Sequence, residues 1–232
     1  MEKLNVAVVG CGIVANDHLK AWNRIDVAQV AAVCDLDEKL AKNAAELYNV
    51  PKYYTSLALL FEENKIDIVD VCTPPQTHAA IGIQAMDAGC NVILEKPMTS
   101  TLEDAKKIVE HQKKTGLKVG VIHNWLFEPP VVEAKDIVNS GQLGEIFHVE
   151  VEALHTVNDQ MTADPNHWSH RHPGGRFGEM IAHPLYLLRH FLGEVQITNL
   201  QVSKIGNLEW MKSDELIMSV TSDNKFGTAY VS

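Results

Sequence analysis

The chain has 232 residues, of which 46% are hydrophobic, 22% charged and 6% aromatic, a composition typical of a globular domain. This length accommodates one large domain or two modest ones. The 30 acidic and 20 basic residues give a net charge of −10, which argues against a groove that follows nucleic-acid phosphates. Because the sequence contains no apolar run long enough to cross a bilayer, we expect a protein that binds neither nucleic acid nor membrane.

The cysteines favour an intracellular protein without disulfides. Cys11, Cys34, Cys72 and Cys90 are scattered and form no paired spacing, which is unlike a disulfide framework, a zinc site or a redox motif. The residues before Cys11 resemble a lipoprotein cleavage site, but they are too few for a signal core. We therefore expect a cytoplasmic location.

The first 123 residues alternate between two hydrophobic patterns. Short apolar runs predict buried strands at 4–9, 27–34, 66–72, 91–94 and 117–122. Between them, helical spacing predicts helices near 14–25, 40–47, 76–88 and 101–115. The last of these follows Ser100-Thr101-Leu102-Glu103, which matches a capping box. Regular alternation predicts an α/β fold with a doubly wound parallel sheet at 1–123.

The pattern changes after residue 123, and residues 124–232 predict a smaller α+β domain. Pro129-Pro130 begins a predicted helix that reaches Ser140, and the alternation over 146–154 predicts a half-exposed strand of an antiparallel sheet. Further elements are an irregular stretch at 155–175, a helix at 177–192, and strands near 195–204, 214–222 and 225–231. Together they predict a mainly antiparallel open sheet.

A dinucleotide fingerprint lies where the first strand becomes a helix. The segment Gly10-Cys11-Gly12-Ile13-Val14-Ala15 has the G-x-G-x-x-A form, in which the glycines allow a tight turn and close approach of a pyrophosphate to the helix start. We expect Gly10, Gly12, Ile13 and Val14 to contact the cofactor there. Asp35 ends the second strand, where an acid binds the ribose 2′-hydroxyl; alternatively, it caps the next helix. Because Leu36 and Asp37 follow rather than Arg, NAD is favoured over NADP. The first domain is predicted to be a Rossmann domain.

Several further segments complete a family resemblance. They are Thr73-Pro74-Pro75-Gln76-Thr77-His78, Glu95-Lys96-Pro97-Met98, Gly141-Gln142-Leu143-Gly144-Glu145-Ile146, Gly174-Gly175, Glu179 and His183-Pro184-Leu185. With the fingerprint they resemble the glucose–fructose oxidoreductase/inositol dehydrogenase (Gfo/Idh/MocA) family. The resemblance implies NAD(P)-dependent oxidation or reduction of a hydroxyl on a sugar, cyclitol or related polyol. It also implies a homodimer or homotetramer formed through the sheet of the second domain. Because the chain ends at Ser232, short of where family members stop, we expect that domain to be truncated.

The resemblance assigns catalytic roles to three residues. Lys96 would hydrogen-bond the reacting hydroxyl, because an ammonium favours a developing alkoxide. His183 matches the family's acid/base histidine. Glu179 stands where the family usually has Asp, and it either supports His183 from one helical turn away or forms an ordinary surface pair with it.

The cofactor would also be lined by the segments that follow two strands. The resemblance implies that Thr73, Pro74 and His78 line it after one strand, and that Glu95 and Lys96 do so after the next. His78 is equally compatible with a simple role at a helix start. The peptide bond before Pro97 is often cis in the family.

The expected substrate contacts lie mainly in the second domain. Leu126 stands where the family often has Arg, so His123 and Asn124 are candidates to replace that contact. Within the histidine-rich segment, Trp168, Arg171 and Arg176 are candidates to bind a polyol beside His183. The spacing His167-x-x-His170-x-His172 is not that of a zinc site, so no metal is expected. Alternatively, much of this loop is a surface without substrate contacts.

The sequence also fits a second function. Glu179 in place of Asp, together with the short second domain, also fits a non-catalytic family member, such as a sensor or regulatory subunit that binds the dinucleotide.

Overall fold

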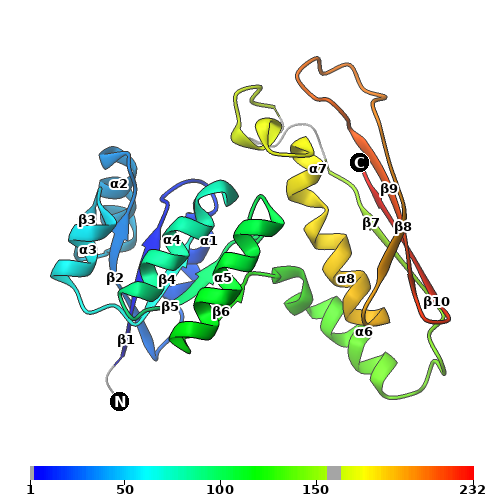
Figure 1. The fold of residues 1–232 in the computed structure, drawn as a ribbon, viewed down its shortest axis with the longest axis horizontal. Coiled ribbons are helices and arrows are strands. Elements are labelled where there is room, and N and C mark those ends of the chain that lie inside the picture. The colour runs from blue at the N-terminus through cyan, green and yellow to red at the C-terminus, as the bar shows by residue number, and fades with distance from the viewer. Residues whose placement is uncertain (1–2, 156–162) are drawn as a thin grey trace. The chain divides into compact units, whose positions relative to one another are not determined.

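The computed structural model describes residues 3–155 and 163–232. The chain forms two compact units, Met1–Ile122 and His123–Ser232. Each has its own sheet (Figure 1).

The first unit is built on a six-stranded sheet in the order β3-β2-β1-β4-β5-β6. All of its strand pairs are parallel. The strands are β1 (Leu4–Val9), β2 (Ala28–Cys34), β3 (Tyr53–Tyr54), β4 (Ile68–Val71), β5 (Asn91–Leu94) and β6 (Val119–Val121). The strand order reverses between β1 and β4, the crevice where sheets of this kind bind ligands. The predicted doubly wound parallel sheet is confirmed.

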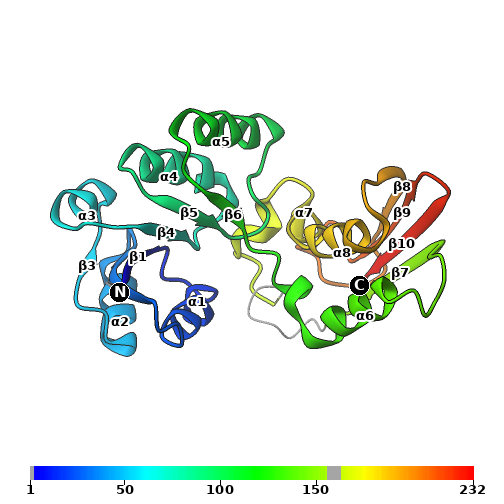
Figure 2. The same ribbon diagram turned by 90° about the horizontal axis from the view of Figure 1, so that it is seen from below.

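Helices cover both faces of this sheet (Figure 2). They are α1 (Ala15–Trp22), α2 (Glu38–Tyr48), α3 (Leu57–Glu63), α4 (Pro75–Asp87) and α5 (Leu102–Thr115). Alternate residues of β1 face opposite sides: Val6 and Val8 pack with α1 and α2, whereas Ala7 and Val9 pack on the side of α3, α4 and α5. Because both faces are covered, the buried part of this strand, Val6–Val9, is a continuous apolar run.

Two local features of the first unit differ from the sequence prediction. The cap of α5 is Thr101, one residue later than the predicted capping box, because its Oγ1 accepts the Asp104 N–H at 3.1 Å and donates to Asp104 Oδ2 at 2.8 Å. The short elements β3 and α3 were not predicted. Two residues carry no periodicity, and the Ser56 side chain does not cap α3.

The second unit has a four-stranded sheet in the order β7-β10-β9-β8. Its strands are β7 (His148–Ala153), β8 (Gln196–Ser203), β9 (Glu215–Ser222) and β10 (Lys225–Val231), and its helical elements are η1 (Asn124–Phe127), α6 (Pro129–Asn139), η2 (Trp168–Arg171), α7 (Gly175–Met180) and α8 (Ala182–Leu192). The β8–β9 and β9–β10 pairs are antiparallel, as expected. The prediction for β7 was wrong in its pairing, because β7 pairs with β10 in parallel.

The core of the second unit lies between α8 and the sheet. Leu188 and Leu192 of α8 pack against Leu216, Met218 and Val220 of β9. The single helix predicted at 177–192 is divided into α7 and α8 at Ile181. Pro184 has no N–H to bond the Met180 carbonyl, which explains the interruption. Within the described residues, no helix is both long enough and apolar enough to span a membrane.

Candidate functional site

The fingerprint glycines form a tight loop between β1 and α1. Gly10 has φ +90°, and a Cβ there would lie 2.8 Å from the backbone of Cys72 and Thr73, so only glycine fits. Gly12, by contrast, is exposed and has open space where a Cβ would stand. The buried Ala15 is the first residue of α1. Val14 is the N-cap residue, and its side chain makes no capping hydrogen bond. The loop thus presents an uncapped helix N-terminus, which favours an anion such as a phosphate.

Asp35 at the end of β2 turns toward this glycine loop. Its Oδ2 accepts the Cys11 N–H at 2.7 Å, and its Oδ1 accepts the Asp37 N–H at 2.9 Å. The alternative that Asp35 caps the next helix is wrong, because the N-cap of α2 is Asp37, whose side chain accepts the Lys39 N–H at 2.8 Å. A carboxylate has further lone pairs, so Asp35 can accept from a ligand hydroxyl as well.

The His78 side chain contacts the backbone of the segment after β4. This side chain is fully buried in α4, with Nε2 2.7 Å from the Thr73 carbonyl and Nδ1 3.2 Å from the Met98 carbonyl. Burial lowers the pKa of His78, and the hydrogen bonds with the Thr73 and Met98 carbonyls oppose this shift. His78 therefore links the segment containing Thr73 and Pro74 to the segment after β5, and it does not itself present a surface to a cofactor.

Glu95 and Lys96 follow β5. The Glu95 Oε2 accepts the Lys96 N–H at 3.0 Å, and the Glu95 N–H donates to the Val71 carbonyl of β4 at 3.0 Å. The Lys96–Pro97 peptide bond is cis, as the resemblance implied. The backbone that carries Lys96 is therefore fixed by the carboxylate of its own neighbour.

A buried polar network beneath this segment was not predicted. His18 of α1 lies between Asp70 of β4 and Glu95, and Trp22 Nε1 donates to Asp70 Oδ2 at 2.7 Å. An acid inside a strand buried on both faces was the available sequence signal, because a buried carboxylate requires partners. Which partners it finds depends on the strand order, which the local sequence does not contain.

In the second unit, His183 is held by two aromatic residues. Its Nδ1 lies 2.6 Å from the Tyr186 hydroxyl, and its ring stacks on Trp125 with a centroid distance of 4.1 Å. The backbone N–H of Trp125 donates to the same hydroxyl at 3.2 Å. Tyr186, which the sequence analysis missed, therefore fixes the orientation of the histidine and engages one of its two ring nitrogens.

Two other predicted residues lie near this cluster along the chain. His123 stacks on Tyr186 with a centroid distance of 4.4 Å, and Asn124 is exposed at the start of η1.

Glu179 is 6% exposed and His183 is 5% exposed. The alternative of an ordinary surface pair is therefore wrong, since both side chains are buried.

The remaining candidate substrate residues have different surroundings. Trp168 contacts His172 edge to face at a centroid distance of 6.1 Å, and the exposed Arg171 donates from Nη2 to the Asn166 carbonyl at 2.7 Å. Arg171 is thus engaged by its own loop. Residues 156–162 of the histidine-rich segment lie outside the described residues.

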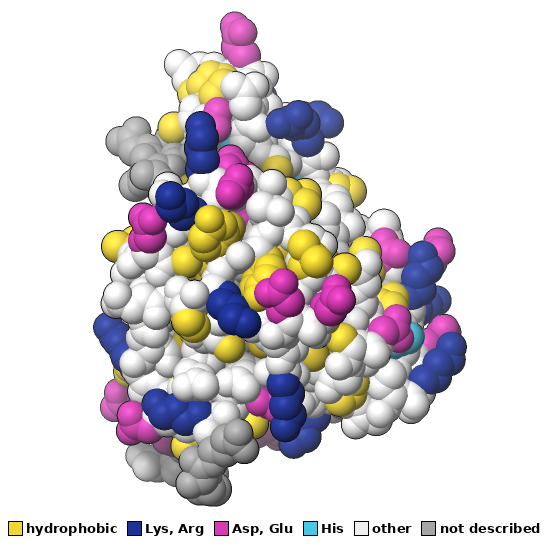
Figure 3. Space-filling model, turned by 90° about the vertical axis from the view of Figure 1, so that its left-hand side faces the viewer, with side chains coloured by type: hydrophobic (Ala, Val, Ile, Leu, Met, Phe, Trp, Pro, Cys, Tyr) yellow, Lys and Arg dark blue, Asp and Glu magenta, His cyan; other side chains and the backbone are white. Residues whose placement is uncertain are grey.

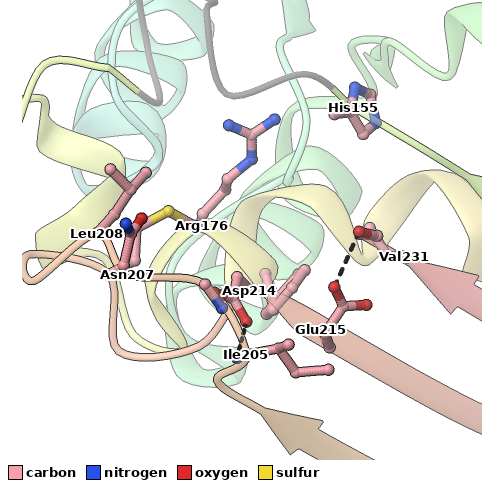
Figure 4. A pocket seen from close by; sticks show the side chains of 12 residues that line it. His155, Arg176, Ile205, Asn207, Leu208, Asp214, Glu215 and Val231 are labelled. Atoms are coloured by element: carbon pink, nitrogen blue, oxygen red, sulfur yellow. Dashed lines mark hydrogen bonds between the residues drawn. The ribbon is translucent and has the colours of Figure 1, made fainter.

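Arg176 borders a cavity of about 490 Å³ within the second unit. Figure 4 shows its side chain beside residues of the loop between β8 and β9 and near the end of β10. The lining residues are His155, Arg176, Phe177, Ile205, Gly206, Asn207, Leu208, Met211, Asp214, Glu215, Val231 and Ser232. The Asp214 carboxylate accepts the Ile205 and Gly206 N–H groups, and Glu215 Oε1 accepts the Ser232 hydroxyl at 3.0 Å.

Charge on the surface is mixed. Figure 3 shows Lys and Arg interspersed with Asp and Glu over the face that it draws.

A doubly wound parallel sheet, a glycine loop opening an uncapped helix and an acid at the end of β2 define a dinucleotide-binding α/β protein. Family models agree: residues 4–123 match "Oxidoreductase family, NAD-binding Rossmann fold", and residues 131–224 match "GFO/IDH/MocA C-terminal domain". The chain belongs to the Gfo/Idh/MocA family.

Relatives and solved structures show the same likeness. The chain is 32% identical to the uncharacterized protein YMR315W of Saccharomyces cerevisiae, over 98% of this chain and 69% of the relative. It is 31% identical to D-apiose dehydrogenase of Rhizobium rhizogenes, over 63% of this chain and 43% of that protein. An oxidoreductase from Agrobacterium radiobacter, solved in complex with NAD⁺, L-tartaric acid and magnesium, is 25% identical, with a TM-score of 0.88 over 99% of this chain and 66% of that one.

Proposed function

We propose that this protein is an NAD(H)-dependent oxidoreductase that moves a hydride between nicotinamide and a secondary hydroxyl of a sugar, cyclitol or related polyol. The geometry of the glycine loop carries the proposal, because it combines an open Gly12, an uncapped α1 and Asp35 turned toward the loop. The chain covers 43% of D-apiose dehydrogenase, whose name supports a sugar-like substrate. Such relatives do not favour the non-catalytic alternative.

The first unit fits the cofactor. Backbone N–H groups of Gly12, Ile13 and Val14 would hold the pyrophosphate, Asp35 would accept a ribose hydroxyl, and Thr73, Pro74 and Glu95 lie on segments that follow neighbouring strands at the same edge of the sheet. A bound nicotinamide supplies the acceptor or donor of the hydride.

Lys96 and His183 have different roles in the proposed reaction. The Lys96 ammonium stabilises the negative charge that develops on the reacting oxygen, and His183 accepts the hydroxyl proton. In the basic form of His183, Nδ1–H donates to the Tyr186 oxygen, which has lone pairs for both this proton and the Trp125 N–H. Nε2 then takes the proton from the substrate. The buried Glu179 supports His183, and Trp168, Arg176, His123 and Asn124 are the candidate substrate contacts.

The test is turnover by purified protein. D-Apiose, D-xylose and myo-inositol are each offered with NAD⁺ from mildly acidic to alkaline pH, and NADH formation is followed. Lys96→Met and His183→Asn should each lower kcat by about 10²-fold or more, with the NADH dissociation constant within about threefold of wild type. Lys113→Met, on the exposed face of α5, is the matched control. Absence of NADH formation with every polyol, or full activity in both variants, overturns the proposal.

The preference for NAD rests on Asp35. A carboxylate accepts the ribose 2′-hydroxyl of NADH and repels the 2′-phosphate of NADPH. Asp35→Ser should raise the NADH dissociation constant about 10-fold or more, the equivalent of one charged hydrogen bond. It should also make the dissociation constants of NADH and NADPH more similar. Asp37→Asn keeps a good N-cap and should leave both constants unchanged. Equal binding of NADH and NADPH by wild type contradicts the preference.

The sheet of the second unit is the proposed surface for a homodimer or homotetramer. Its outward positions include Ile217 of β9 and Phe226 of β10, which are 47% and 41% exposed. Sedimentation equilibrium of wild type and of a double Ile217→Lys, Phe226→Lys variant tests this, with a smaller assembly expected for the variant. A monomeric wild type rejects it.

A further inference from the structure

His18 connects α1, the helix that follows the glycine loop and is called the dinucleotide helix below, to the segment that carries Lys96. Its Nδ1 lies 2.9 Å from Asp70 Oδ2, and its Nε2 lies 3.0 Å from Glu95 Oε1. The side chains of His18, Asp70 and Glu95 are only 12%, 2% and 13% exposed. One imidazole thus bridges the buried carboxylate of Asp70 in β4 and the largely buried carboxylate of Glu95, which directly follows the adjacent strand β5.

Between two ionised carboxylates, His18 must carry two protons. An ionised carboxylate only accepts hydrogen bonds, so each ring nitrogen must donate, which is possible for the imidazolium alone. Asp70 Oδ2 also receives the Trp22 Nε1–H, so this oxygen is an acceptor from two sides. Burial by itself lowers the pKa of His18, but hydrogen bonds with Asp70, Cys72 and Glu95 outweigh it and raise the pKa far above its usual value.

Glu95 passes this link on to Lys96. One carboxylate oxygen faces His18, and the other accepts the Lys96 N–H at 3.0 Å. His18 lies one turn into α1, and its own N–H donates to the Val14 carbonyl at the helix start. A chain of hydrogen bonds therefore runs from the start of the dinucleotide helix through His18 and Glu95 to the backbone of Lys96.

We propose that His18 is a positioning residue, which as an imidazolium holds the Glu95 carboxylate under the Lys96 amide and so fixes Lys96 relative to the dinucleotide loop. The effect on turnover rests on the proposed function, whereas the effect on the surroundings of Lys96 does not. Cys72 Sγ is 3.9 Å from Asp70 Oδ1, and burial raises the pKa of this thiol, so it remains protonated beside the network.

Two spectroscopic measurements test the proposal without turnover. In the full chain labelled with ¹⁵N-histidine, both His18 nitrogens should show imidazolium shifts at about pH 8, where ordinary histidines are neutral. After reductive ¹³C-methylation, the Lys96 resonance, assigned by its loss in Lys96→Arg, should shift in His18→Gln and in Glu95→Gln. The double variant should add little to either single change.

His111→Gln is the matched control, because His111 Nε2 pairs with Asp87 Oδ1 at 2.8 Å elsewhere in the first unit. It should leave the Lys96 resonance in place. A neutral His18 ring at about pH 8, or a Lys96 resonance unchanged in a folded His18→Gln variant, overturns the proposal.

Turnover gives the third measurement, with a polyol that wild type oxidises. His18→Gln should lower kcat by about 10–100-fold with NADH binding within about threefold, since a misplaced catalytic group costs rate more than cofactor affinity. If wild type oxidises none of the polyols while the two spectroscopic results hold, the proposed function fails and the positioning of Lys96 stands. A kcat in His18→Gln equal to that of His111→Gln overturns the positioning role.

Discussion

Gly10 and Gly12 stand two residues apart in one loop, but they are required for different reasons. A Cβ on Gly10 meets backbone at 2.8 Å, and its φ of +90° disfavours every other residue, whereas a Cβ on Gly12 meets nothing within 4 Å. Gly10→Ala should therefore destabilise the first unit by about 1–3 kcal/mol or prevent its folding. Gly12→Ala should unfold at the wild-type urea concentration and yet lose NADH binding by about 10-fold or more, because the added methyl occupies space needed by the pyrophosphate.

Urea unfolding and NADH fluorescence titration separate these two effects. If the Gly12→Ala variant binds NADH as tightly as wild type does, the glycine loop is not part of the cofactor site. Equal destabilisation by both substitutions contradicts the steric argument.

The raised pKa of His18 also predicts how stability depends on pH. A group protonated more readily in the folded state stabilises fully below its unfolded pKa, here 6.5, and this contribution is lost as the pH rises through the folded pKa. The difference in unfolding free energy between wild type and His18→Gln should thus shrink above pH 6.5 by about 1.4 kcal/mol per pH unit. Urea unfolding at a series of pH values measures it. The opposite slope would show that burial, which lowers the pKa, outweighs the carboxylates.

At the scale of residues, sequence reasoning found the groups that local motifs mark and missed those defined by topology. Asp35 and Lys96 follow predicted strands, so their places could be inferred. The pairing of His18 with Asp70 and Glu95 joins α1 to β4 and to the segment after β5, both much later in the chain. Tyr186 gains its role only through Trp125 and His183.

At the scale of elements, α5 offers a direct measure of helix capping. Thr101 Oγ1 accepts the Asp104 N–H, whereas Ser56, which precedes α3, makes no side-chain cap. Thr101→Ala should lower the free energy of unfolding by about 1 kcal/mol, and Ser56→Ala should change it by less than about 0.5 kcal/mol. Urea unfolding of the two variants checks this. Equal losses would place the cap of α5 elsewhere.

The longer strands of the first unit were predictable because burial on both faces makes them largely apolar runs. Tyr53–Tyr54 is too short for any such pattern, and the partner of β7 depends on β10, more than seventy residues later in the chain. The interruption at Ile181 was in principle visible in Pro184. Strand pairing was not, since alternation reports which face is buried and not which neighbour is hydrogen-bonded.

At the scale of the whole molecule, the two units have separate cores. Val6, Val8, Ala7 and Val9 of β1 pack within the first unit, and Leu188 packs with the sheet of the second. Residues 1–122 expressed alone should therefore fold and bind NADH with a dissociation constant of the same order as that of the whole chain. Circular dichroism and NADH fluorescence measure this, with the same fragment carrying Gly12→Ala as the control. A fragment that is unfolded, or folded without NADH binding, contradicts it.

The parallel pairing of β7 with β10 has a consequence during synthesis. His148 pairs with Phe226, so β7 can gain its partner strand only after residue 226 has left the ribosome. In the first unit β1 already finds β2 within the first 34 residues and β4 by residue 71. Because closing a long loop before its contacts form slows folding, the first unit is expected to fold while the second is still being made. A dinucleotide could then bind a nascent chain and stabilise it before the second unit exists.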